Sequence, residues 1–230
     1  MNQSATPRSK VRVVIIDDHV LFAESLELGF EVEGYWVRRL GLPESGGSAQ
    51  AYLSSVLRLK PRVVLLDLDL GRFGDGTRLI APLTQAGIAV VVVTGSLDHG
   101  RWGECLRYGA RKVLAKTRPL NEILATVRRI NEGLQVMDAE ERATLLEAWH
   151  KRRVEQRELS ARLELLTTRE REVLGHLTYG RTVRDIAAIS FVSEATVRNQ
   201  VKSILAKLEV SSQLAAVGMA HHVGWQSPVS

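Results

Sequence analysis

Short apolar runs, rich in β-branched residues, recur through the first half of the chain and are separated by stretches of helix length. The runs predict strands near residues 11–16, 35–40, 62–66, 88–94 and 111–115, and the other stretches predict helices near 19–30, 47–59, 76–86, 98–108 and 119–132. Strands that alternate with helices form parallel sheets covered on both faces. The first half therefore predicts an α/β doubly wound five-stranded parallel sheet.

The pattern changes after Gly133. Residues 138–165 contain no strand signal but many Glu, Arg, Leu and Ala, and Asp138 with Glu141 predicts a helix start. A sparse apolar stripe runs along this segment, at Leu145, Trp149, Leu159 and Leu163. We expect one long linker helix that packs on a neighbour or pairs with itself; a solvated connector helix is the alternative.

The last segment predicts four short helices and no strand. Thr167 with Glu170 forms a capping-box pattern, Thr182 with Asp185 a weaker one, and Gly180 is placed to end the first helix. Further helices are expected from Ser193 and from Ser211. The chain therefore divides into a flavodoxin-like α/β domain over residues 10–132, a helical linker over 133–165 and an all-α four-helix domain over 166–225.

Five polar residues stand where predicted strands end. They are Asp17 and Asp18 after the first strand, Asp67 after the third, Thr94 at the end of the fourth and Lys116 after the fifth. Ligands of open parallel sheets bind at the carboxyl ends of the strands, so these side chains should share one pocket. Three carboxylates, a hydroxyl and an ammonium suit a divalent cation and a phosphoryl group.

Magnesium is the cation that this donor set favours, because it prefers oxygen ligands and keeps several waters. Asp17, Asp18 and Asp67 would supply carboxylates, with the backbone carbonyl of Asp69 as a further ligand. With the charge neutralised, Asp67 could attack phosphorus as a nucleophile. Lys116 and the Thr94 hydroxyl could then each bind a phosphate oxygen.

The helix expected near residues 194–208 has two different faces. Its apolar stripe predicts contact with a core and comprises Val197, Val201, Ile204, Leu205 and Leu208. Arg198, Asn199 and Lys202 lie on the opposite side, where Arg suits guanine, Asn suits adenine and Lys suits phosphate. With the helix over 182–189 it predicts a helix-turn-helix; the alternative is an ordinary solvated face.

The acidic pattern over about residues 10–132 resembles the receiver domain of two-component response regulators. The resemblance rests on Asp17-Asp18, the Val-Val-Leu-Leu-Asp67 strand, Thr94-Gly95 and Lys116. It implies that Asp67 accepts a phosphoryl group from a cognate histidine kinase. It also implies that Thr94 then moves toward the phosphate and shifts the face formed by the fourth helix, fifth strand and fifth helix.

Three positions depart from that family pattern. Gly71 replaces the usual proline, the loop 72–76 is one residue longer, and Val113 replaces the aromatic switch residue. The first two are expected to loosen the loop without removing a ligand. The third leaves the usual threonine–aromatic coupling in question.

The C-terminal helices resemble the LuxR/FixJ-type DNA-binding domain. The resemblance rests on Leu166-Thr-Thr-Arg-Glu-Arg-Glu-Val-Leu174, Asp185-Ile-Ala187, Ser193-Glu-Ala-Thr-Val-Arg198 and Val201-Lys-Ser-Ile-Leu-Ala-Lys-Leu208. It implies that DNA contacts involve Arg198, Asn199 and Lys202, together with Thr196 and with Gln200, which stands where many members have histidine. The helix over 211–222 is implied to form the dimer surface.

Composition adds little but excludes some classes. The single cysteine, Cys105, precludes an intrachain disulfide and fits a cytoplasmic protein. No signal peptide is expected from the polar stretch 1–10, and the apolar runs are too short to predict a membrane span. The net charge of +5 only weakly favours an acidic partner. The six histidines, at 19, 99, 150, 176, 221 and 222, suggest no metal site.

Taken together, these features predict a cytoplasmic response regulator of the LuxR/FixJ type. Its partners would be a histidine kinase, double-stranded DNA and a second copy of itself in a phosphorylation-favoured dimer. A constitutive DNA binder with a docking receiver is the second hypothesis. A degenerate receiver is a third, and a haloacid-dehalogenase-like phosphatase using Asp67 and Asp69 is a fourth that leaves Asp17 and Asp18 unexplained.

Overall fold

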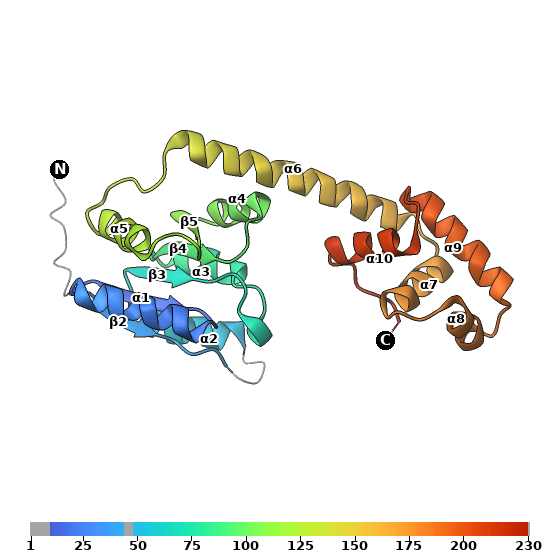
Figure 1. The fold of residues 1–230 in the computed structure, drawn as a ribbon, viewed down its shortest axis with the longest axis horizontal. Helices are drawn as coiled ribbons and strands as arrows, with labels where there is room; N and C mark the ends of the chain where they lie inside the picture. Colours follow the sequence, from blue (N-terminus) through green and yellow to red (C-terminus); the bar gives the residue numbers. More distant parts are fainter. Residues whose placement is uncertain (1–9, 44–47, 230) are drawn as a thin grey trace. The chain divides into compact units, whose positions relative to one another are not determined.

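The computed structural model describes residues 10–43 and 48–229, and these form two compact units divided between His150 and Lys151 (Figure 1). The predicted polar N-terminal stretch before residue 10 and the predicted helix start at residue 47 lie outside the described residues. Within the described residues, no helix combines the length and the apolar character that crossing a membrane needs.

The N-terminal unit contains a five-stranded, fully parallel sheet in the order β2-β1-β3-β4-β5. The strands are β1 (Arg12–Ile16), β2 (Trp36–Arg39), β3 (Val63–Leu66), β4 (Ala89–Thr94) and β5 (Lys112–Ala115). In register, Ile16 pairs with Leu66, and Thr94 pairs with Ala115. The residues that follow these strands therefore meet at one edge, and the predicted doubly wound sheet is confirmed.

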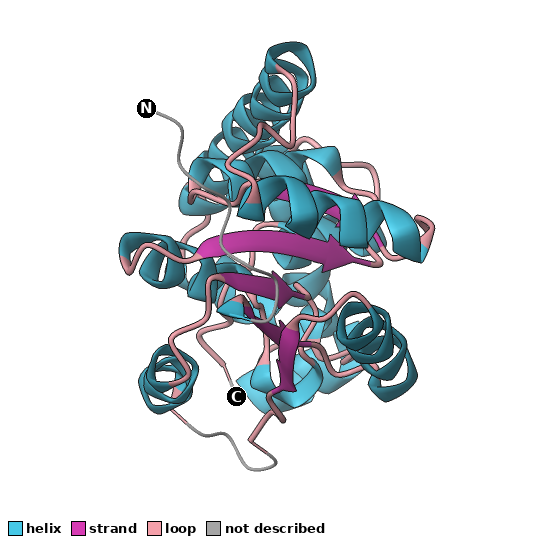
Figure 2. Ribbon diagram, turned by 90° about the vertical axis from the view of Figure 1, so that its left-hand side faces the viewer, coloured by secondary structure: helices cyan, strands magenta, loops and turns pink. Residues whose placement is uncertain are grey.

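Helices cover both faces of this sheet (Figure 2). The helices are α1 (Val20–Val32), α2 (Ala49–Arg58), α3 (Thr77–Gln85), α4 (His99–Arg107) and α5 (Leu120–Asn131), with a 3-10 turn η2 (Gly71–Phe73) before α3. Alternate strand residues point to opposite faces. Thus Val13 and Ile15 pack with α1 and α5, whereas Val14 and Ile16 pack with α2, α3 and α4. Burial on both faces explains why the strands are continuous apolar runs.

The predicted linker helix is present as α6 (Ala139–Glu164). Its start is confirmed, because the Asp138 carboxylate accepts the Glu141 N–H at 2.6 Å. In the N-terminal unit Leu145 is buried in the core on the sheet face that is covered by α2, α3 and α4. In the C-terminal unit Leu163 is buried in the core of the helical domain. Each end therefore packs on its own unit, while the residues around Val154 are exposed.

The C-terminal unit contains the four predicted helices, α7 (Thr168–Thr178), α8 (Val183–Ser190), α9 (Glu194–Leu208) and α10 (Gln213–His222). Both predicted capping boxes are complete, at Thr167 with Glu170 and at Thr182 with Asp185. Gly180 follows α7 with a φ of +73°, as a helix-ending glycine should. The expected stripe of α9 faces the core, with Leu205 only partly buried.

Candidate functional site

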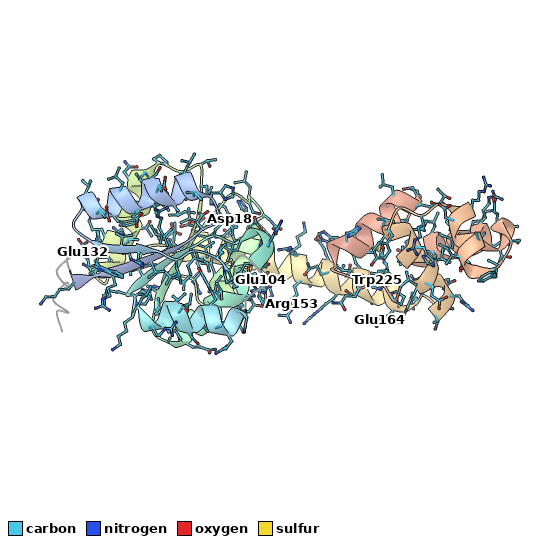
Figure 3. The ribbon with its side chains drawn as sticks, turned by 90° about the horizontal axis from the view of Figure 1, so that it is seen from below. Asp18, Glu104, Glu132, Arg153, Glu164 and Trp225 are labelled. Atoms are coloured by element: carbon cyan, nitrogen blue, oxygen red, sulfur yellow. The ribbon has the colours of Figure 1, made fainter. Side chains whose placement is uncertain are left out.

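Asp17, Asp67 and Lys116 lie in direct contact at the carboxyl edge of the sheet. Lys116 Nζ donates to Asp17 Oδ1 at 2.8 Å and to Asp67 Oδ2 at 2.7 Å. The side chains of Asp17 and Asp67 are only 3% and 1% exposed. Asp18, beside them, and Glu132 lie at opposite ends of the N-terminal unit (Figure 3). The sequence prediction that residues 17, 67 and 116 converge is borne out by these distances.

Asp18 completes a cluster that also includes His19, a residue that the sequence analysis set aside. Ligand atoms of Asp17, Asp18, His19 and Asp67 all lie within 4.8 Å of one another. His19 Nδ1 is 2.8 Å from Asp18 Oδ1 and 3.0 Å from Lys116 Nζ. Its position could have indicated this, because His19 directly follows Asp17 and Asp18 and so lies at the same strand end.

The two oxygens of Asp67 have different surroundings. Oδ1 accepts the backbone N–H of Leu68 at 2.7 Å and that of Asp69 at 3.3 Å, while Oδ2 faces Lys116. Burial raises the pKa of Asp67, an effect that Lys116 opposes and Asp17 reinforces. For Lys116, burial favours the neutral amine, but hydrogen bonds to Asp17 and Asp67 leave its pKa raised. The single ammonium of Lys116 therefore pairs with two buried carboxylates, and the cluster has more acidic than basic side chains.

This donor set fits a hard divalent cation. The carboxylate oxygens of Asp17, Asp18 and Asp67 are the ligands that Mg²⁺ prefers, and a 2+ charge would offset the excess negative charge. Asp69 can contribute only through its backbone, because its carboxylate is 59% exposed and pairs with Arg101 at 2.9 Å. That orientation also removes the acid–base group that the phosphatase hypothesis requires.

Thr94 lies in the core and contacts its own loop. Its residue is fully buried, and its Oγ1 accepts the Ser96 N–H at 3.2 Å. Val113, at the position of the family's aromatic switch, is 2% exposed and belongs to the core between the sheet and α2, α3 and α4. The position that holds the aromatic switch residue in the family is therefore occupied here by a buried aliphatic side chain.

The loop after Asp67 is held by several contacts, and the expectation that it is looser than in the family stays a prediction. Asp69 and Asp75 form an antiparallel bridge, and Phe73 is buried with its carbonyl bound by Arg78. Gly71 has a φ of +53°, which proline cannot adopt, and a methyl carbon on it would lie 3.0 Å from Asp18 Oδ2. The longer loop therefore uses a left-handed glycine where the family pattern has proline.

On α9 four of the five predicted DNA-facing residues are exposed. Arg198 is paired with Glu194 at 2.6 Å, and its side chain is 61% exposed. Thr196, Asn199 and Lys202 are also exposed, whereas Gln200 is half-buried. Ser193 Oγ accepts the Thr196 N–H at 3.1 Å and so fixes the start of the helix. The structure thus places this polar face outside the helical core.

Sequence comparison connects both units to known families. A model described as response regulator receiver domain matches residues 13–128, and one described as bacterial regulatory proteins, luxR family, matches residues 164–220. The chain therefore belongs to the response regulators, with a receiver domain followed by a LuxR-type DNA-binding domain. Its family consists of transcription regulators rather than classical enzymes, which excludes the phosphatase hypothesis.

Individual relatives are distant but cover nearly the whole chain. The transcriptional regulatory protein LnrK of Bacillus subtilis is 27% identical over 90% of this chain and 94% of its own length. The response regulator protein VraR of Staphylococcus epidermidis is 28% identical with the same coverage. A solved structure of RcsB from Salmonella typhimurium is 22% identical, covers 93% of this chain and 98% of that chain, and has a TM-score of 0.48.

Proposed function

We propose that this chain is a cytoplasmic transcription regulator switched by phosphorylation of Asp67. The observation that carries the proposal is the contact of Lys116 with both Asp17 and Asp67, beside Asp18, at the carboxyl edge of the sheet. A buried carboxylate between an ammonium and two further acids is arranged to accept a phosphoryl group. Magnesium bound by Asp17, Asp18, Asp67 and the Asp69 carbonyl would neutralise charge during transfer.

The phosphoryl donor is a histidine kinase. Asp67 Oδ2 forms a bond to phosphorus while the phosphorus–nitrogen bond of the phosphohistidine breaks, and the imidazole leaves with the bonding electrons and takes up a proton. Lys116 then binds a phosphoryl oxygen instead of the carboxylate. The buried Thr94 hydroxyl leaves Ser96 to bind another, which alters the loop that leads into α4.

The output is sequence-specific binding to double-stranded DNA. Arg198 and Asn199 contact base edges in the major groove, Lys202 contacts phosphate, and Thr196 and Gln200 lie beside them. Phosphorylation favours a dimer, formed through α10, that binds paired half-sites. In α10, Ala216 and Ala220 fill the domain's own core, so the surface offered to a partner is the opposite side with Leu214 and Gly218. Residues 10–132, 133–165 and 166–225 would act as receiver, linker and DNA-binding domain.

The test measures intact mass and solution molar mass after incubation with Mg²⁺ and acetyl phosphate. Wild type should gain one phosphoryl group and shift from monomer to dimer, whereas Asp67→Asn should do neither. Asp69→Asn is the matched control, because it keeps the backbone carbonyl and should still gain the group. Absence of phosphoryl gain in wild type would refute the proposal.

A constitutive DNA binder is the second candidate, and the core position of Val113 favours it. In that case the receiver would only dock partners. DNA selected from a random-sequence pool distinguishes the two candidates. Under the switch proposal acetyl phosphate should tighten wild-type binding and leave Asp67→Asn unchanged, whereas the constitutive binder should respond in neither protein.

A further inference from the structure

Helix α4 contacts the phosphoacceptor loop with one residue and the linker helix with another. Arg101, in its first turn, reaches the loop that follows Asp67, and Gly103, two residues later, packs on the first half of α6. All of these residues belong to the N-terminal unit. The helix therefore forms a continuous physical connection from the phosphorylation site to the linker.

Arg101 forms ion pairs with both ends of the loop 68–75, which follows Asp67. Its guanidinium pairs with Asp69 at 2.9 Å and with Asp75 at 3.2 Å, and its side chain is only 18% exposed. A longer contact of 3.5 Å joins it to the carbonyl of Leu68, the residue directly after Asp67. Since Asp69 and Asp75 already form a backbone bridge, any displacement of this loop also displaces Arg101.

A second bond joins α4 to the segment after Thr94. The indole N–H of Trp102 donates to the Ser96 carbonyl at 2.8 Å, and the Ser96 N–H is bound by the Thr94 hydroxyl. The loop after Asp67 and the segment after Thr94 are thus attached to adjacent residues of one short helix.

Helices α4 and α6 are in close van der Waals contact at Gly103. A methyl carbon built on Gly103 would lie 2.0 Å from the carbonyl oxygen of Leu145 and 2.8 Å from Trp149 Cβ. The two helices therefore touch backbone to backbone, and only glycine permits it. The start of α6 is further held by Lys112, which binds both oxygens of Glu141 at 2.6 and 2.7 Å.

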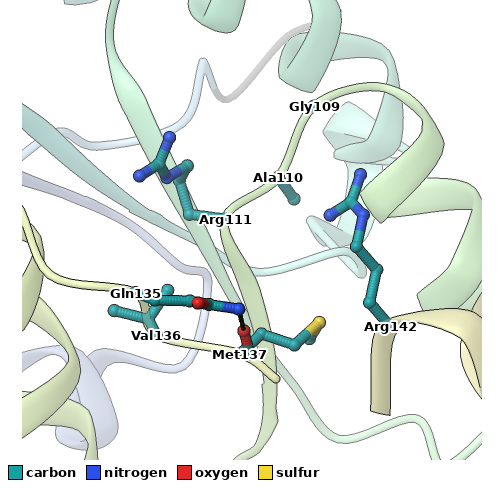
Figure 4. Close-up of a pocket in the computed structure, with 7 residues that line it drawn as sticks. All are labelled: Gly109, Ala110, Arg111, Gln135, Val136, Met137 and Arg142. Carbon is teal, nitrogen blue, oxygen red and sulfur yellow. Dashed lines mark hydrogen bonds between the residues drawn. The ribbon is translucent and has the colours of Figure 1, made fainter. Parts of the chain in front are cut away.

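The start of α6 also borders empty space. A pocket of about 340 Å³ lies between the loop 109–111, which precedes β5, and the segment that leads into α6, with Arg111 and Arg142 on either side of it (Figure 4). Gln135 bonds to the Met137 carbonyl along its lower edge. The first turns of α6 are thus close-packed against α4 and paired with Lys112, but they leave open space toward the loop 109–111.

We propose that α4 transmits phosphorylation of Asp67 to the linker helix, with Arg101 as the positioning residue that holds the loop and Gly103 as the contact that moves α6. The proposal rests on the switch described above and names its route in this chain. A phosphoryl group adds negative charge next to Leu68 and Asp69 and draws the guanidinium toward it. Because α4 cannot approach α6 further, the first half of α6 loosens from the receiver. This route does not use the aromatic residue that Val113 replaces.

The experiment follows amide hydrogen exchange of the α6 segment 139–150 in the full chain, with and without acetyl phosphate and Mg²⁺. Intact mass in the same samples gives phosphoryl occupancy, so that variants are compared at matched occupancy. Wild type should show a rise of about fivefold or more in exchange on phosphorylation. Arg101→Ala should lose that response, and Arg101→Lys should keep part of it, because lysine can pair with only one of the two acids. Arg107→Ala, on the exposed end of the same helix, is the control and should respond like wild type.

Gly103→Ala provides an independent test, since alanine does not weaken the helix and leaves Asp67 untouched. It should show high exchange in segment 139–150 without phosphorylation, and little further change with it. Phosphoryl gain without an exchange response in wild type would overturn this proposal alone, whereas absence of phosphoryl gain would overturn the switch as well. If Arg101→Ala showed the same rise in exchange on phosphorylation as wild type, Arg101 would have no role in transmitting the signal to α6.

Discussion

Glu170 caps the start of α7 and also bonds to side chains of α9. Its carboxylate accepts the Thr167 N–H at 2.7 Å to complete the capping box, and also binds Ser203 and Lys207 of α9, each at 2.6 Å. Burial opposes its ionisation, but the bonds to Lys207 and Ser203 prevail and lower its pKa to about 2. A local sequence motif thus also joins α7 to α9.

Replacing Glu170 with Gln should therefore destabilise the DNA-binding domain by about 2 kcal/mol at pH 7. The amide can still cap the helix, but it leaves Lys207 without its charged partner. Since the folded pKa of about 2 lies below the ordinary value of 4.5, this stability is present above pH 4.5 and is lost as the pH falls toward 2. Calorimetry of the full chain at pH 7 and pH 3 should show a difference between wild type and variant that shrinks at the lower pH.

The control for Glu170 is Glu172→Gln on the same helix. Glu172 pairs with Arg169 at 2.7 Å, and the Arg169 side chain is 75% exposed, so solvent screens the pair and it contributes little. Its unfolding midpoint should stay near that of wild type at both pH values. An equal loss in the two variants would contradict a specific role for Glu170.

Phe191 carries backbone strain at the turn of the helix-turn-helix. It ends α8 with a φ of +55° and is 95% exposed, so that its side chain gains little from burial. Phe191→Gly should stabilise the domain by ~0.5–1 kcal/mol, because glycine adopts the left-handed conformation without steric cost. Calorimetry can compare it with Tyr179→Gly, an exposed helix end with a φ of −87°, which should lower stability instead. A loss in both variants would show that Phe191 is not strained.

At the scale of elements, the proposed function gives α9 two kinds of DNA contact, to base edges and to phosphate, that mutation can separate. Arg198→Ala should relax base preference at one position of the selected DNA by ~1–3 kcal/mol, whereas Lys202→Ala should weaken all sequences alike and lower the salt slope by about 1. Titrations of single-base variants of that DNA at several salt concentrations measure both effects. If Lys202→Ala affects one base position selectively, the assignment of roles is wrong.

Elements with a local signal could be predicted from the sequence, and this includes every strand and most helix ends. The acids and the lysine at strand ends were predictable because parallel register brings consecutive strand ends to one edge. Arg101 and Gly103 were not, because their partners lie far along the chain and no local pattern links an arginine to Asp69 or a glycine to Leu145. The contacts that hold the loop around Gly71 could not be predicted for the same reason.

At the scale of the whole molecule, the proposed phosphorylation site at Asp67 and the proposed DNA-reading helix α9 lie in different compact units that share α6. If phosphorylation of the receiver tightens DNA binding, the two events are linked through one conformational equilibrium. Linkage then requires that the effect be reciprocal and equal in size in both directions.

Beryllium fluoride, which binds a receiver carboxylate with Mg²⁺ in place of a phosphoryl group, makes that reciprocity measurable at equilibrium. Selected DNA should tighten beryllium fluoride binding by the same factor by which beryllium fluoride tightens DNA binding. Coupling of this kind is commonly about 5–150-fold. Calorimetric titrations in both directions give the two factors, and Asp67→Asn should show DNA binding without any response. Gly103→Ala should reduce both factors together, because α6 would already be released in that variant. Unequal factors in wild type would mean that DNA and the phosphoryl analogue do not act on one shared equilibrium, and would require a second conformational change beyond the movement of α6.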